Sequence, residues 1–107
     1  MTPKLQEIFA EAYRELRPRA PFPEFHVQFF PFSNINNTIR LREGRVLVRI
    51  SDLLSGAPKD VLHAIAHILL AKLYRKEIVS RHATRYRRYL GRRDVSGKAH
   101  LLRQQRG

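Results

Sequence analysis

The chain has 107 residues and no cysteine, and 43% of its residues are hydrophobic. This composition predicts one globular domain with a real core, and it excludes a disulfide framework and a thiolate metal site. The formal net charge is +12, and residues 72–107 hold twelve Lys and Arg against two Asp and Glu, whereas residues 1–71 hold nine against seven. So basic a segment predicts a polyanionic partner, nucleic acid ahead of acidic lipid or acidic protein.

Two features bear on location. The longest uncharged apolar run, residues 61–71, is shorter than the roughly 20 residues that a membrane span needs. The first sixteen residues contain glutamates where a signal peptide would be apolar. Together with the absence of cysteine, these features favour a cytoplasmic protein with no membrane partner.

The first predicted element is a helix that starts at Thr2-Pro3, because a hydroxyl cap followed by proline is a common helix start. It ends before "RPRAPFP", since three prolines in seven residues cannot continue a helix. One face carries apolar residues at helical spacing: Leu5, Ile8, Phe9, Ala12 and Leu16. A different face carries Glu7, Glu11 and Glu15.

Strand character follows. "EFHVQFFPF", residues 24–32, is aromatic and β-branched, and "TIRLREGRVLVRI", residues 38–50, predicts a hairpin with its tight turn at "REGR". Gly44 can supply the positive φ that such a turn needs. We therefore expect a small three-stranded sheet, antiparallel throughout, with helices on its apolar face: an α+β fold.

Two further helices complete the predicted domain, residues 1–93, before a basic tail or linker at residues 94–107. One opens at Pro58 and runs to about Tyr74, and the other is capped by Ser80 and ends near Gly91. On the last helix one face holds His82, Tyr86 and Tyr89, which we expect to pack inward. The opposite face holds Arg81, Arg85, Arg88 and Arg92.

We interpret the basic face as a nucleic-acid contact. Few carboxylates accompany it, whereas a purely solvating surface normally mixes charge signs. The predicted binding residues are Arg81, Arg85, Arg88 and Arg92, joined by Arg75 and Lys76. They would contact backbone phosphates, of DNA ahead of RNA, because no base-reading motif is present.

The segment "VLHAIAHILLAK" places His63 and His67 four residues apart, on one face of the predicted helix. This is the spacing of an H-E-x-x-H zinc site, in which two histidines hold the metal and the glutamate activates water. Ala64 takes the glutamate's place here. The spacing alone leaves two alternatives: a metal site without its base, or two core histidines bonded to backbone or to Tyr74.

Three stretches resemble the SprT-like zinc metallopeptidases, a minimal zincin-like family: "LQEIFAEAYREL" with "FHVQFF", "RVLVRISDLLSGAPKDVLHAIAHILLAKLY", and "HATRY". The resemblance implies zinc ligands at His63, His67 and His82. It places the catalytic glutamate on Ala64, which cannot accept a proton, so no catalytic residue is predicted. It is also compatible with a second, competent peptidase-like domain as a partner.

The leading functional hypothesis is therefore a non-catalytic SprT-like domain that binds nucleic acid through its basic C-terminal surface and retains a structural zinc ion. One alternative is a zinc-dependent metallopeptidase or hydrolase with an unrecognised base. Another is a structural or protein-interaction domain.

Overall fold

The computed structural model describes residues 5–32 and 36–91. The elements, in order, are α1 (Leu5–Leu16), β1 (Glu24–Phe30), β2 (Asn37–Arg42), β3 (Arg45–Ser51), a 3₁₀ turn (Asp52–Leu54), α2 (Lys59–Leu73) and α3 (Ser80–Leu90). The α+β class is thereby confirmed. The predicted helix start at Thr2-Pro3, the basic residue Arg92 and the tail at 94–107 lie outside the described residues.

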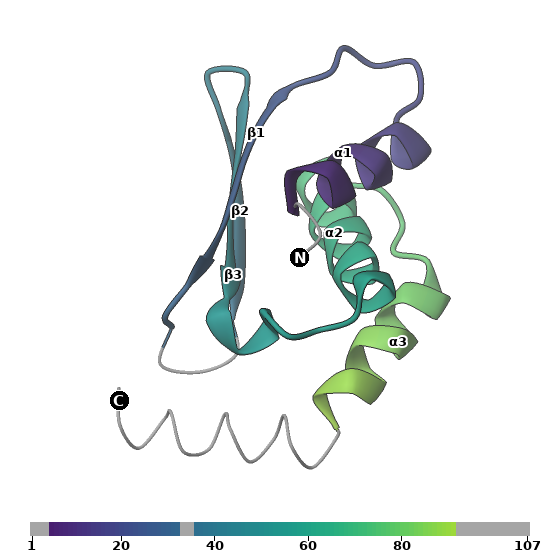
Figure 1. Ribbon diagram of the computed structural model, residues 1–107. Helices are drawn as coiled ribbons and strands as arrows, with labels where there is room; N and C mark the ends of the chain where they lie inside the picture. The colour runs from purple at the N-terminus through teal and green to yellow at the C-terminus, as the bar shows by residue number, and fades with distance from the viewer. Residues whose placement is uncertain (1–4, 33–35, 92–107) are drawn as a thin grey trace.

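The molecule has a sheet layer and a helix layer (Figure 1). Helices α1 and α2 pack together on one side of the sheet, and α3 packs against α2. No described helix covers the other side of the sheet (Figure 1). Within the described ranges, no helix is both long and apolar enough to cross a bilayer.

The sheet is mixed, so the expectation of a wholly antiparallel sheet was wrong. Its strand order is β1-β3-β2, with β3 antiparallel to β2 and parallel to β1. β3 lies at the centre and is the most buried strand: Val46, Val48 and Ile50 are fully buried, whereas β2 contributes no buried residue. A central strand can satisfy hydrogen-bonding groups on both its edges while it buries most side chains.

The hairpin between β2 and β3 turns as the sequence predicts. Glu43 has a φ of 53° and Gly44 a φ of 76°. Two consecutive positive φ angles define the mirror-image turn whose twist matches that of paired strands. The turn aligns Arg42 directly with Arg45 across the hairpin.

Helix α2 is the centre of the core and is buried on most sides. Its buried residues include Leu62, Ile65 and Leu70, which lie in one cluster with Phe9 of α1 and Val48 of β3. A helix buried nearly all round must satisfy or neutralise any polar side chain it carries. His63 and His67 are the polar side chains that α2 brings into this apolar setting.

One helix boundary differs from expectation. Ser80 is the first residue of α3 rather than its cap, and Val79, in extended conformation, holds the capping position without a side-chain hydrogen bond. The helix therefore begins one residue earlier, because the extended conformation ends at Val79.

Candidate metal centre

Three helices bring their polar side chains to one place in the helix layer. α2 contributes His63 and His67, whose ring centroids are 4.8 Å apart. α1 contributes Glu15 from its last turn, with Oε1 at 2.7 Å from His63 Nε2 and at 3.6 Å from His67 Nε2. One ligand atom from each of these three residues lies within 4.8 Å of the others, so the group could hold a metal ion.

The chain reverses between α2 and α3 through a tight helix end, and this reversal places His82. Lys76 N donates to Ala71 O at 2.7 Å, Arg75 N donates to Lys72 O at 3.4 Å, and Arg75 has a φ of 55°. These bonds and the left-handed residue form a Schellman motif, usually made with glycine. The following connector leads into α3, whose first turn carries His82 onto α2.

His82 lies against the His63–His67 pair. Its ring stacks on that of His67 with centroids 4.3 Å apart and 14° between planes, and its centroid is 5.7 Å from that of His63. Imidazole lone pairs lie in the plane of the ring, so two stacked rings direct theirs along parallel planes. A shared ion would therefore require His82 to rotate relative to His67. The structure brings the three predicted ligands into contact, with Glu15 in the ion-holding group and His82 beside it.

The buried nitrogens of this cluster lack hydrogen-bond partners. Within the described ranges, the buried side-chain nitrogen and oxygen atoms without a partner are His67 Nε2 and both ring nitrogens of His82. The residues are 8% and 4% exposed, respectively. Each unsatisfied buried polar group costs about 1–3 kcal/mol, so the cluster is unfavourable unless something else satisfies these atoms.

The electrostatics of the site favour the neutral forms of His67 and His82 and the ionised carboxylate of Glu15. Burial, with repulsion from His67 and Arg81, lowers the pKa of His82 to about 4. Burial and repulsion from His63 also lower the pKa of His67. Burial opposes ionisation of Glu15, but the hydrogen bond with His63 and the attraction of His63 and His67 together outweigh it, so the pKa of Glu15 falls below its usual value. Neutral imidazole and carboxylate are the forms that ligate metals.

Glu15 is the site residue that the sequence analysis missed. The sequence did hold one indication of it, because Glu15 belongs to the face of the first predicted helix that carries glutamates. Nothing local, however, connects that face to a histidine 48 residues away. Ala64, at the position of the H-E-x-x-H glutamate, is fully buried and offers no acid–base group. The carboxylate beside the histidines thus comes from α1 instead of α2.

The basic residues of α3 lie on its exposed side. Arg81, Arg85 and Arg88 are exposed, while His82 is buried and Tyr86 and Tyr89 pack against the core. The inward and outward faces therefore lie as the helical spacing predicts. Tyr86 also accepts a hydrogen bond from Asn37 Nδ2 at 2.8 Å. Arg85 lies 3.8 Å from Asp60, an exposed ion pair.

Arg75 and Lys76 are exposed in the turn before α3. They lie on the same connection as Glu77, which is also exposed. The described part of the predicted nucleic-acid surface is therefore accessible.

Comparison of the chain with protein-family models, curated proteins and solved structures finds no match. The function is consequently argued from the geometry of the site.

Proposed function

We propose that this domain binds zinc and uses the ion to hold its three helices together. The observation that carries the proposal is the buried histidine cluster, with partnerless nitrogens on His67 and His82 next to the Glu15 carboxylate. Nitrogen and carboxylate donors suit zinc, which takes imidazole and carboxylate ligands in tetrahedral sites. His63, His67 and Glu15 would hold the ion, and His82 would complete the set.

Each helix contributes at least one of these side chains, so an ion bound there would cross-link α1, α2 and α3. Binding free energy at such a site adds to folding free energy, because the unfolded chain has no preformed site. This is the role of a structural zinc ion.

We propose that the domain is not catalytic. Ala64 supplies no base, and a carboxylate that serves as a metal ligand is not free to activate water. This fits the degenerate SprT-like member that the sequence resembles, in which the scaffold and the ion are kept without the protease chemistry.

A second candidate, a zinc-dependent hydrolase, is favoured by one observation. The Glu15 side chain is 45% exposed and that of His63 is 20% exposed, so the centre opens to solvent on the α1 side. With three histidines on the ion, Glu15 would be free to act as the base that Ala64 cannot be. The two candidates differ in whether Glu15 binds the metal.

The partner that we propose is nucleic acid, contacted through phosphates by the exposed arginines of α3. Their exposure and the scarcity of neighbouring carboxylates support it. A protein partner, such as a second peptidase-like domain, is the remaining alternative for the same surface. The cytoplasmic location stays a prediction from composition.

Elemental analysis tests the metal proposal directly. The chain, purified without a histidine tag or added metal, should contain close to one zinc per molecule, and removal of zinc by a chelator should lower its melting temperature. The His63→Ala/His67→Ala variant should lose the zinc, whereas His26→Ala, an exposed histidine on β1, should retain it. Metal-free wild-type protein that binds no added zinc would refute the proposal.

A further inference from the structure

The uncovered face of the sheet, called here the outer sheet face, collects residues from all three strands. Side chains in register across a sheet point to the same side. On β3 the alternate residues Val46, Val48 and Ile50 are buried under the helices, so the outer side chains of that strand are Arg45, Leu47 and Arg49. Their partners on the neighbouring strands are Glu24, His26, Gln28, Thr38, Arg40 and Arg42.

This face is strongly basic. It holds four arginines, and the only carboxylate among the in-register residues named above is Glu24. Arg42 is aligned directly with Arg45, and like charges placed opposite each other destabilise a sheet. Glu24 offsets this positive charge at one end of the face only. Its Oε2 lies 3.1 Å from Arg45 Nε and 3.3 Å from His26 Nε2. A bound polyanion would relieve the remaining repulsion.

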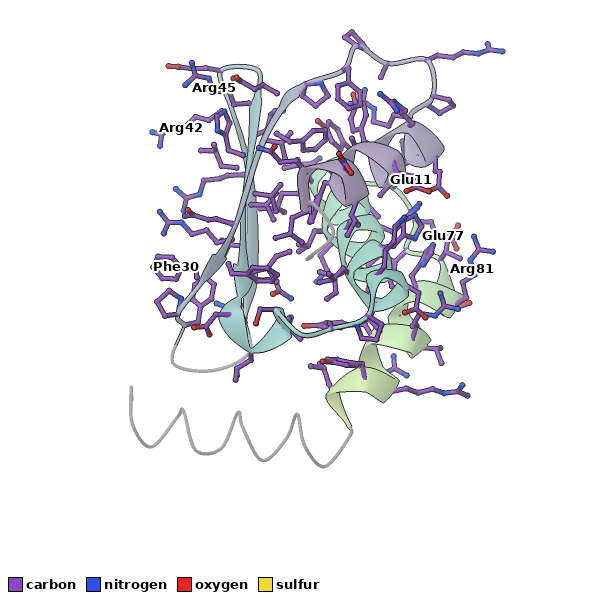
Figure 2. The ribbon with its side chains drawn as sticks, viewed as in Figure 1. Glu11, Phe30, Arg42, Arg45, Glu77 and Arg81 are labelled. Carbon is purple, nitrogen blue, oxygen red and sulfur yellow. The ribbon has the colours of Figure 1, made fainter. Side chains whose placement is uncertain are left out.

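Aromatic rings adjoin these arginines at the other end of the strands. Phe30, the last residue of β1, continues the outward series of that strand, and Figure 2 shows it projecting away from the helices, as Arg42 and Arg45 do. The Arg49 guanidinium carbon lies 4.7 Å from the Phe30 ring centroid. The Phe30 and Phe32 rings are 4.8 Å apart. The Arg49 guanidinium thus lies over the Phe30 ring, with the Phe32 ring tilted by 51° beside it, and together they form a stacking platform next to the charges.

The same face is hollowed. A cavity of about 610 Å³ has His26, Gln28, Thr38, Arg40 and Arg49 in its lining, together with Phe32. The amide of Gln28 and the hydroxyl of Thr38 can both donate and accept hydrogen bonds there. A ligand on this face would therefore meet cations, a stacking platform and neutral polar groups together.

We propose that the outer sheet face binds single-stranded nucleic acid. Arg40, Arg42 and Arg45 would contact phosphates, and unstacked bases would lie on the platform of Phe30 and Arg49. Basic grooves with aromatic residues bind single strands in this way, because a base can stack on a side chain only when it has left the duplex. A duplex keeps its bases stacked inside and could use only the arginines.

This site goes beyond the function proposed above, since it needs neither zinc nor α3. Arg42 and Arg45 lie on the opposite side of the molecule from Arg81 (Figure 2). The two basic surfaces can therefore be tested separately.

The experiment measures fluorescence anisotropy of a labelled twelve-nucleotide oligo(dT), the same length of oligo(U), and a twelve-base-pair duplex, each with the full chain over a salt series. Arg40→Ala/Arg49→Ala alters the outer sheet face, and Phe30→Leu removes the ring while keeping apolar bulk. The matched control is Arg19→Ala/Lys59→Ala, which removes two exposed cations elsewhere. Circular dichroism checks that each variant is folded.

We expect the wild-type chain to bind the single strands more tightly than the duplex. Arg40→Ala/Arg49→Ala should weaken single-strand binding about tenfold or more, because it removes one phosphate contact and half of the platform. It should shallow the salt slope by about 0.7, for the one phosphate contact that Arg40 makes. Phe30→Leu should weaken single-strand binding about fivefold or more and leave duplex binding unchanged. Similar results with oligo(U) and oligo(dT) would indicate that the sugar is not read.

Several outcomes would overturn the proposal. One is that a folded Arg40→Ala/Arg49→Ala variant binds single strands as tightly as the wild type does. Another is that the Arg19→Ala/Lys59→Ala control loses as much single-strand affinity as the outer-face variant. A third is that the wild-type chain binds no single strand at 50 mM salt. Duplex-preferring binding that depends on Arg85 and Arg88 would overturn it while supporting the α3 surface. Concentration-dependent dimerisation that the outer-face variants abolish, without nucleic-acid binding, would assign the face to a second copy of the chain.

Discussion

Glu15 and His63 face each other across the contact between α1 and α2, with Oε1 of the carboxylate 2.7 Å from Nε2 of the imidazole. The pKa of the Glu15 carboxyl is lowered, so it is ionised at neutral pH and the imidazole N–H donates the hydrogen bond. The same carboxylate oxygen is 3.6 Å from His67 Nε2. One acidic side chain therefore joins two potential metal ligands, and it is the side chain that decides between the two candidate functions.

If Glu15 is a zinc ligand, replacing it with glutamine should weaken zinc binding while preserving the shape of the site. We expect Glu15→Gln to lose about tenfold or more in zinc affinity, because a neutral amide is a far poorer ligand than a carboxylate. Competition with a chromophoric chelator measures the change. Glu11→Gln, on an exposed position of the same helix, should bind zinc as the wild type does. Equal affinities in the two variants would remove Glu15 from the ligand set.

Proteolysis distinguishes the structural role from the catalytic one. We expect no cleavage of casein by the zinc-loaded chain above the level of His67→Ala, because Ala64 cannot act as a general base and a base typically contributes about 10²–10⁴-fold. Cleavage products would be followed by gel and by mass spectrometry. Activity that both His67→Ala and Glu15→Gln abolish would establish the hydrolase, with Glu15 as its base.

The metal-free protein should lose stability on mild acidification. The pKa of His82 is about 4 in the folded chain against 6.5 ordinarily, so between these values the unfolded chain binds more protons. Stability therefore falls as pH decreases through this window, by about 2 kcal/mol from pH 7 to pH 5. The groups that oppose protonation of His82 are His67, Arg81, His63 and Arg85.

Urea unfolding in the presence of a chelator at the two pH values measures this loss. His82→Leu should remove most of the pH dependence, whereas His26→Gln should retain it. An unchanged dependence in a folded His82→Leu variant would show that other groups cause the acid sensitivity.

A substitution in the turn between β2 and β3 should stabilise the fold. Glu43 adopts a φ of 53°, which is unfavourable for most L-residues, and asparagine before glycine is preferred in this type of turn. Glu43→Asn should raise the free energy of unfolding by about 0.5–1 kcal/mol. Glu43→Gln, which removes the charge without easing the backbone, should have little effect. Equal stabilisation by both variants would attribute the gain to charge.

The basic surface of α3 predicts salt-dependent duplex binding. Arg85→Ala/Arg88→Ala should weaken binding to all duplex sequences alike and shallow the salt slope by about 2, at about 0.9 for each lost phosphate contact. The fold should survive, because the ion pair of Arg85 with Asp60 is exposed and such pairs contribute at most about 1 kcal/mol. Fluorescence anisotropy measures the binding, with Arg19→Ala/Lys59→Ala as the control. Unchanged duplex binding would leave the arginines as a solvated face.

Local features were predictable from the sequence because short-range geometry determines them. The i, i+4 spacing stacks His63 and His67 on one helix face whatever the rest of the chain does. The prolines after α1 end that helix, and Gly44 allows the hairpin turn, through backbone restrictions that act within a few residues. The opposite faces of α3 follow from helical periodicity in the same way.

Only the tertiary structure decided what lies next to these features. β1 pairs parallel to β3, a choice that depends on which strand buries most apolar surface at the centre of the sheet. Glu15 reaches His63 because α1 and α2 bury their apolar faces against each other, and that packing brings the last turn of α1 beside the histidines. The outer sheet face is open because the helices all lie on the other side (Figure 1). Periodicity along the chain determines which residues share a face, whereas the burial of one face against another determines what each face meets.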